Sequence, residues 1–151
     1  MSLRLRLTLL YSTLTGGILL VFAAAVIMVF NALLVDQIDN TLESAANVII
    51  NRIEVNSLGQ VSLDLSSIDI SSDVYVQVWG LDNELQVSLR TLDDFVDRPF
   101  DPDALRAESP IYRDVRLANH QLRVLSVPIL DGEHKIAVLQ VAVRQIGRAH
   151  V

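Results

Sequence analysis

A long run of residues without charge near the N-terminus constrains this chain more than any other feature. Residues 7–35 contain no Asp, Glu, Lys, Arg or His. A hydrocarbon core about 30 Å thick is crossed by roughly 20 apolar helical residues. Residues 16–35 alone supply that length. We therefore expect a membrane-spanning helix over residues 7–35.

Two other interpretations of this segment fit the sequence less well. A cleaved signal peptide has an apolar stretch of roughly 7–15 residues followed by a cleavage site of small residues. The only such cluster here is residues 23–25, and cleavage there would leave VIMVFNALLV at the new N-terminus. A buried core helix would need more chain to cover it than the remainder supplies. We interpret the segment as an uncleaved anchor.

The charges that flank the anchor predict its orientation. Positively charged residues favour the cytoplasmic side of a membrane. Arg4 and Arg6 precede the span, whereas Asp36, Asp39 and Glu43 follow it. We expect residues 1–6 in the cytoplasm and residues 36–144 outside it, with the anchor in the inner (plasma) membrane of a bacterium.

The soluble part is acidic. Residues 36–144 carry nine basic and 18 acidic side chains, a net charge of −9. Nucleic-acid binding needs basic surfaces, so we expect no such partner. The chain has no cysteine, which excludes a disulfide scaffold and thiolate metal sites.

The first 20 residues after the anchor show a helical repeat. In DQIDNTLESAANVIINRIEV the apolar residues form one stripe, which predicts a helix continuing to about Glu54. We expect the stripe to form a signalling-helix interface with its own domain, with a twin subunit, or with both, through Ile38, Leu42, Ala45 and Ile49.

The period then changes from helical to two, as strands require. DVYVQVW places Val74, Val76 and Val78 on one face and Tyr75, Gln77 and Trp79 on the other. Similar alternation occurs in residues 61–65, 85–89, 116–130 and 134–144, with turns at GLDNE, Asn119–His120 and DGE; Pro128 is expected at a bulge or an edge. Residues 91–110 are expected to form a loop with one helical turn at 102–107. The predicted fold class is α+β, with the helix packed on an antiparallel sheet.

Four segments in this order resemble the N-terminal sensor region of bacterial two-component sensor histidine kinases. They are SLRLRLTLLYS, DQIDNTLESAANVI, VYVQVWGLDNELQVS and LRVLSVPILDGEHKIAVLQVAV, within residues 2–144. The resemblance implies a five-stranded, PAS-like extracytoplasmic sensor domain over a helix, held between two membrane spans.

The resemblance also implies a function and partners. The chain would be the signal-sensing and transmembrane signalling module of a sensor kinase, a homodimer that reads an unknown small ligand or cation. The kinase core of the full-length parent would use ATP and Mg²⁺ and transfer phosphate to a response regulator. These residues contain no His-Glu phosphoacceptor motif and no Gly-rich nucleotide loop, so we expect no catalytic residue and no cofactor here.

Other functions stay open at this point. In the same class, the chain could be the input domain of a chemoreceptor or of a cyclic-dinucleotide enzyme. In other classes, it could be a complete single-pass anchored binding or scaffold protein, or a membrane-anchored hydrolase. A hydrolase requires a convergent nucleophile, base and oxyanion site, and no such pattern is visible.

Two groups of residues are candidate binding sites. Clustered carboxylates suit hard cations such as Mg²⁺ and Ca²⁺, and five lie within the loop: Asp93, Asp94, Asp97, Asp101 and Asp103. Their spacing matches no EF-hand and Arg98 lies among them, so a solvated loop is the ordinary interpretation. Tyr75 and Trp79 share a strand face and could line a ligand pocket, although aromatic residues in a sheet are more often core.

The last residues have an unusual composition. IGRAHV is the translation of ATCGGAAGAGCACACGTC, a common sequencing-library adapter in one reading frame. We therefore expect the tail, residues 145–151, to be non-native from Ile146 onward, and we assign no function to His150.

Overall fold

The computed structural model describes residues 3–64, 68–90, 92, 97–117 and 120–145. The chain divides into two compact units, Met1–Gln37 and Ile38–Val151, which we describe separately. One helix, α1 (Leu3–Ile50), contributes to both units.

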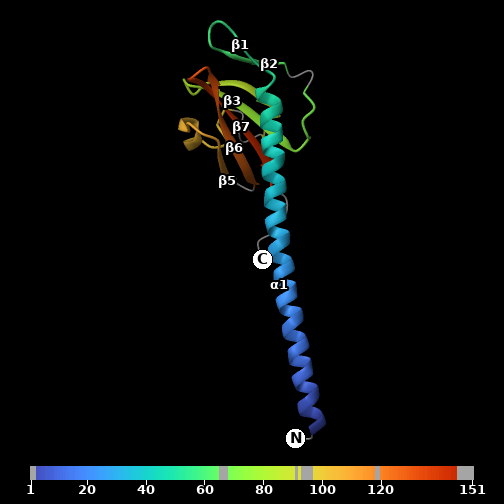
Figure 1. Cartoon of the computed structure of the whole chain (residues 1–151). Coiled ribbons are helices and arrows are strands. Elements are labelled where there is room, and N and C mark those ends of the chain that lie inside the picture. Colours follow the sequence, from blue (N-terminus) through green and yellow to red (C-terminus); the bar gives the residue numbers. More distant parts are fainter. Residues whose placement is uncertain (1–2, 65–67, 91, 93–96, 118–119, 146–151) are drawn as a thin grey trace. The chain divides into compact units, whose positions relative to one another are not determined.

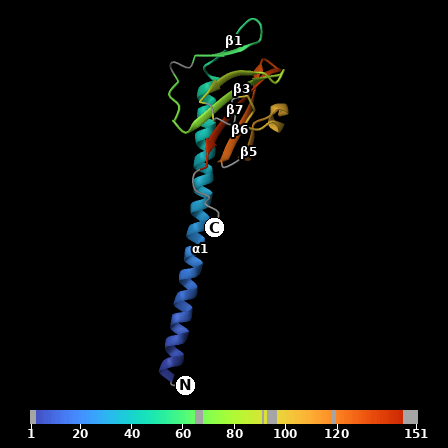
Figure 2. The same ribbon diagram turned by 180° about the vertical axis from the view of Figure 1, so that it is seen from behind.

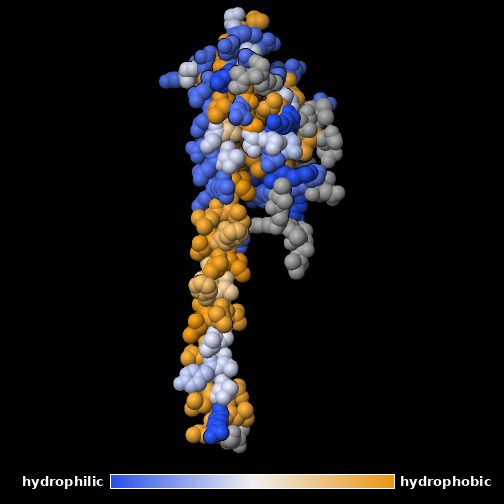
Figure 3. All heavy atoms as spheres, turned by 90° about the vertical axis from the view of Figure 1, so that its right-hand side faces the viewer, coloured by the Kyte–Doolittle hydropathy of each residue, from blue (hydrophilic) through white to orange (hydrophobic). Residues whose placement is uncertain are grey.

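The first unit is helical and hydrophobic on all sides. Its side chains from Leu7 to Phe30 are exposed. Figure 3 shows apolar side chains over most of the visible surface of this segment. Helix α1 is long and apolar enough to cross a membrane, and its most apolar window is wholly exposed. These properties fit a membrane location.

Helix α1 ends earlier than the sequence predicted. The prediction placed its end near Glu54, but the helix stops at Ile50, and Asn51 and Arg52 form a turn. Ile53 then begins β1 (Ile53–Val55), which pairs antiparallel with β2 (Val61–Leu63). Ile53 fits the helical stripe and also packs against the core from a strand, so periodicity alone could not locate the boundary.

A five-stranded antiparallel sheet forms the centre of the second unit (Figure 1). Its order is β4-β3-β7-β6-β5, with strands β3 (Val74–Gly80), β4 (Leu85–Leu89), β5 (Ile111–Leu117), β6 (His120–Asp131) and β7 (His134–Arg144). Gly132 turns β6 into β7 at a φ of 64°, a conformation that glycine adopts without a steric penalty. The predicted α+β fold is confirmed.

The main core lies between the sheet and the C-terminal part of α1. Leu42 and Ile49 are 0% exposed and pack with Val76, Val78 and Leu139, which are also 0% exposed. The alternation predicted for β3 is correct, because its valines all point to this core. In Figure 2, the same helix segment and the short 3-10 helix η3 (Asp103–Arg106) lie on opposite sides of the sheet.

Three local expectations can be compared with the structure. The helical turn expected at 102–107 is present as η3. His120 was expected in a turn, but it begins β6 and pairs with Leu117, while Asn119 lies outside the described residues. Pro128 lies beyond Ser126, where pairing with β5 ends, and next to a register shift between Ile129 and Leu130. This position tolerates a residue without an N–H group.

Candidate functional site

The face of the sheet opposite α1 is covered by a segment of irregular chain, residues 97–107, which we call the cover segment. Phe100, 1% exposed, anchors it against Leu122, Val124 and Ala142. Beneath it the sheet presents polar side chains where a core would normally be apolar.

Three of these polar side chains form a row across the sheet. Gln77 on β3 lies opposite Gln140 on β7, and Gln140 lies opposite Ser126 on β6. Gln77 and Gln140 are 0% exposed and Ser126 is 1% exposed. We call these residues the polar row. Buried amides and hydroxyls are costly unless they form hydrogen bonds, so their partners explain why they are there.

The polar row binds the backbone of the cover segment. Gln140 Nε2 donates to the carbonyl oxygen of Asp101 at 2.7 Å, and its Oε1 accepts from the Asp101 N–H at 3.3 Å. Gln77 Nε2 donates to the Arg98 carbonyl at 3.2 Å, while its Oε1 accepts from Trp79 Nε1 at 3.0 Å. The side chains of the row thus supply hydrogen bonds to backbone groups of the cover segment that no neighbouring strand pairs with.

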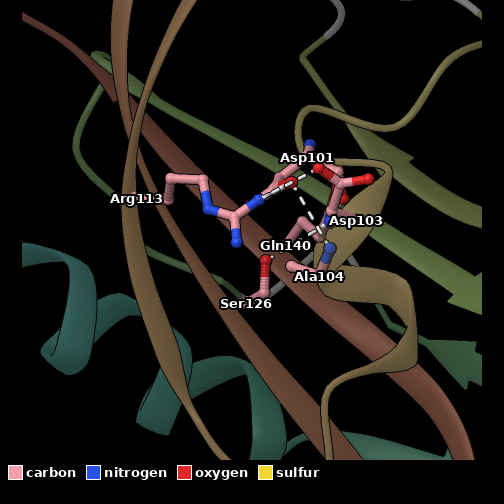
Figure 4. A network of polar contacts seen from close by, with 6 residues as sticks. All are labelled: Asp101, Asp103, Ala104, Arg113, Ser126 and Gln140. Carbon is pink, nitrogen blue, oxygen red and sulfur yellow. Dashed lines mark hydrogen bonds and ion pairs between the residues drawn. The ribbon is translucent and has the colours of Figure 1, made fainter.

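Asp101 is the buried charge of this face. Its Oδ1 accepts from Arg113 Nη1 at 3.1 Å and from the Ala104 N–H at 3.3 Å, so it also binds the first turn of η3. Arg113 also reaches Asp103 Oδ2 at 3.4 Å, and Figure 4 shows its guanidinium directed at both carboxylates. Asp101 is 3% exposed, and its Oδ2 has no hydrogen-bond partner in the described part of the chain.

The far end of the cover segment is held by a lysine. Lys135 Nζ donates to the carbonyl oxygens of Leu105 and Ala107 at 2.8 and 2.9 Å. Carbonyls at the end of a helical turn lack internal partners and favour a cation. The segment is thus fixed by charged and polar contacts at both ends of η3.

The structure describes three of the five aspartates of the predicted acidic cluster. Asp101 and Asp103 share Arg113, Asp97 is exposed, and Asp93 and Asp94 lie outside the described residues. Within the part of the chain that is described, no three His, Cys, Asp or Glu side chains come together as metal ligands. Here the cation beside Asp101 is a guanidinium, and cation binding at the five aspartates stays a prediction.

The two aromatic candidates lie on the covered face. Trp79 is 4% exposed and bonded to Gln77, and Tyr75 is half-buried against the cluster around Phe100. In this state both side chains contribute to packing, and a role in ligand binding stays a prediction.

A second polar group joins α1 to the sheet. Arg123 on β6 binds Asp39 of α1 through two bonds, Nε to Oδ1 at 2.9 Å and Nη2 to Oδ2 at 3.0 Å. Its Nη1 donates to Asp114 Oδ1 at 3.1 Å, and its guanidinium lies 5.6 Å from the ring centre of Tyr112.

The hydrogen bond to Asp39 raises the pKa of Arg123 further, so it stays charged. Burial raises the pKa of the Tyr112 hydroxyl, and the carboxylates of Glu43 and Asp39 add to that effect.

The helical stripe faces the same sheet. Leu42, Ala45 and Ile49 lie inside the main core, and Ile38 packs at its margin. The stripe thus packs within its own domain, and an interface with a twin subunit stays a prediction.

Sequence reasoning did not identify the polar row, Arg123 or Asp39 as a connected set. One signal was available, because a glutamine interrupts an otherwise apolar strand in both VYVQVW and AVLQVAV. Such a residue in a doubly covered strand requires a buried partner. The ion pair joins residues 84 positions apart, and no local pattern indicates it.

Comparison with known proteins gives one family. The family model described as "Two-component sensor kinase N-terminal" matches residues 17–151. No curated protein and no solved structure matches the chain.

Proposed function

Because the chain belongs to the two-component sensor kinase N-terminal family, we propose that residues 36–144 form its extracytoplasmic sensing domain. The anchor helix would hold this domain at the inner membrane and carry its signal to a kinase core. That core would use ATP and Mg²⁺, act as a homodimer and phosphorylate a response regulator. The family favours this parent over a chemoreceptor or a cyclic-dinucleotide enzyme.

One observation carries the proposal. Asp39, close to the start of the second unit, binds Arg123, and Arg123 pairs in the sheet with Val143. Val143 is the residue before Arg144, where β7 ends. The helix that leads from the predicted span and the last strand of the sheet therefore meet at one end of the domain. A domain held between two spans requires this arrangement.

The orientation rests on charge. Arg4 and Arg6 lie on the N-terminal side of the apolar segment, and every acidic residue of the chain lies after it. This distribution favours a cytoplasmic N-terminus. The antiparallel five-stranded sheet over a helix supports the PAS-like description of the domain.

The covered face is where we expect a stimulus to act. The cover segment depends on a few directional bonds to Gln77, Gln140, Arg113 and Lys135, so a small polar ligand or a cation that competes for them would release it. Tyr75, Trp79 and the aspartates of the loop are the side chains that such a stimulus would meet.

Thiol labelling of intact cells tests the location. The chain has no cysteine, so each introduced cysteine is unique. Leu58 and Leu3 are 80% and 81% exposed. A membrane-impermeant maleimide should label Leu58→Cys in intact cells and Leu3→Cys only after lysis. Labelling of Leu3→Cys alone in intact cells would refute the proposed orientation, and with it an extracytoplasmic sensing domain.

A further inference from the structure

We infer that a chain of polar contacts through Asp39, Arg123, Asp114 and Gln145 couples α1 to the end of β7. We call these four residues the polar bridge. The inference rests on the proposed function, because it assigns the bridge to the passage of a signal between the two segments that would lead to the membrane.

The first link fixes the helix in one orientation. Arg123 contacts both oxygens of Asp39, at 2.9 and 3.0 Å. A planar guanidinium and a carboxylate form this pair of parallel bonds in only one relative geometry. A turn of 100° per residue separates neighbouring side chains on a helix, so rotation of α1 by one position removes the pair.

The apolar contacts of α1 do not impose the same restriction. Leu42, Ala45 and Ile49 pack on the sheet through burial, which is not directional. Small rotations of the helix can keep most of that burial. The bridge therefore adds a directional contact to apolar packing that small rotations change little.

The second link connects the pair to the end of the sheet. Asp114 Oδ1 accepts from Arg123 Nη1 at 3.1 Å and also from Gln145 Nε2 at 3.0 Å. The Gln145 N–H donates to the Gln121 carbonyl at 2.9 Å, which extends the ladder one residue past β7. A single carboxylate oxygen thus joins the arginine of the helix contact to the residue that leaves the sheet.

The charge balance makes the bridge sensitive to the loss of one member. Arg123 is the cation between Asp39 and Asp114, and its side chain is 19% exposed while theirs are 28% and 48% exposed. Without the Asp39 charge, Arg123 is free to turn toward Asp114, where it competes with Gln145. An event that displaces α1 should therefore loosen Gln145, and the reverse coupling follows by linkage.

Amide hydrogen exchange of the full chain in lipid nanodiscs tests this coupling. Asp39→Asn removes the charge with little change in shape, and Arg123→Lys keeps the charge but loses the paired geometry. Both should speed exchange of the Gln145 amide by about fivefold or more, the lower end of ordinary coupling. Asp36→Asn, the same charge change at an exposed residue outside the bridge, should leave it unchanged.

Two results would overturn the inference. One is unchanged exchange at Gln145 in both bridge variants. The other is an equal increase at the Leu139 amide, in the core of β7, because that would show general destabilisation instead of coupling. Failure of the proposed function is distinguishable, since it depends on the labelling of Leu58→Cys and not on exchange rates.

Discussion

Gln140 is a fully buried amide on a central strand, and its hydrogen bonds to the cover segment explain why a polar side chain is there. It satisfies both the N–H and the carbonyl of Asp101, which no strand pairs. The cover segment is therefore held by this side chain as well as by the burial of Phe100. The polar row is a structural requirement of a sheet face that is covered by irregular chain.

We predict that Gln140→Leu lowers the free energy of unfolding by about 1–3 kcal/mol, because it leaves two buried backbone groups of Asp101 without partners. Urea unfolding followed by the fluorescence of Trp79, the single tryptophan, measures the change. Gln121→Leu, at a partly exposed position of β6, is the matched control. Equal stability of Gln140→Leu and the wild type would show that the polar row does not hold the cover segment.

The raised pKa of Tyr112 makes the stability of the domain depend on pH in the alkaline range. Burial raises its pKa above the ordinary 10.0, so the folded chain keeps the phenolic proton to higher pH than the unfolded chain does. Its contribution to stability is then complete below pH 10.0 and is lost as the pH rises through the folded pKa. NMR titration of ¹³C-labelled tyrosine, assigned with Tyr112→Phe, should show this late titration.

The neighbours of Tyr112 supply a further check of the same shift. Glu43→Gln should lower the pKa of Tyr112 toward its ordinary value, because the Glu43 carboxylate opposes phenolate formation. Glu84→Gln, in the turn between β3 and β4, should leave it in place. A Tyr112 that titrates at its ordinary pKa of 10.0 would contradict the packing described around Arg123.

The burial of the side chains of helix α1 changes between the first unit and the second. Every residue from Leu3 to Gln37 is exposed, whereas Leu42 and Ile49 are 0% exposed. The first part is long and apolar enough to cross a membrane, and the apolar side chains of the second part pack on one face of the sheet.

Leu42→Ala should destabilise the domain by about 2–5 kcal/mol, since it opens a cavity between α1 and the sheet. Val48→Ala, at a position 41% exposed on the same helix, should change stability by about 0.5 kcal/mol or less. Thermal unfolding followed by circular dichroism compares the two. Similar losses of stability in the two variants would contradict the burial of Leu42 and the exposure of Val48.

Periodicity predicted most of these elements correctly and set their boundaries less well. The strands at 74–80 and 134–144 were recognised because their alternation is long and unbroken. The predicted end of α1 is too late, because Ile53 fits the apolar spacing of the helix. In the structure, Ile53 lies in β1 and pairs with Leu63 of β2. The covered face could not be predicted, since it depends on where a loop of low periodicity folds back on the sheet.

Two arginines at the N-terminus should determine how the whole chain is oriented in the membrane. Replacing Arg4 and Arg6 by glutamine removes the charges that favour a cytoplasmic N-terminus. We expect a smaller fraction of molecules with Leu58→Cys accessible to an impermeant maleimide in intact cells. Arg116→Gln, on the exposed side of β5, should not alter that fraction. An unchanged fraction in the double variant would show that other residues set the orientation.

If this chain is the input part of a sensor kinase, the genomic locus must encode the rest of that kinase after it. Long reads through the codon for Gln145 would show what the reading frame encodes next. We predict a second apolar span, then a histidine phosphoacceptor helix and an ATP-binding domain. A stop codon directly after Val151 in clean genomic DNA would contradict the account and favour an anchored binding protein.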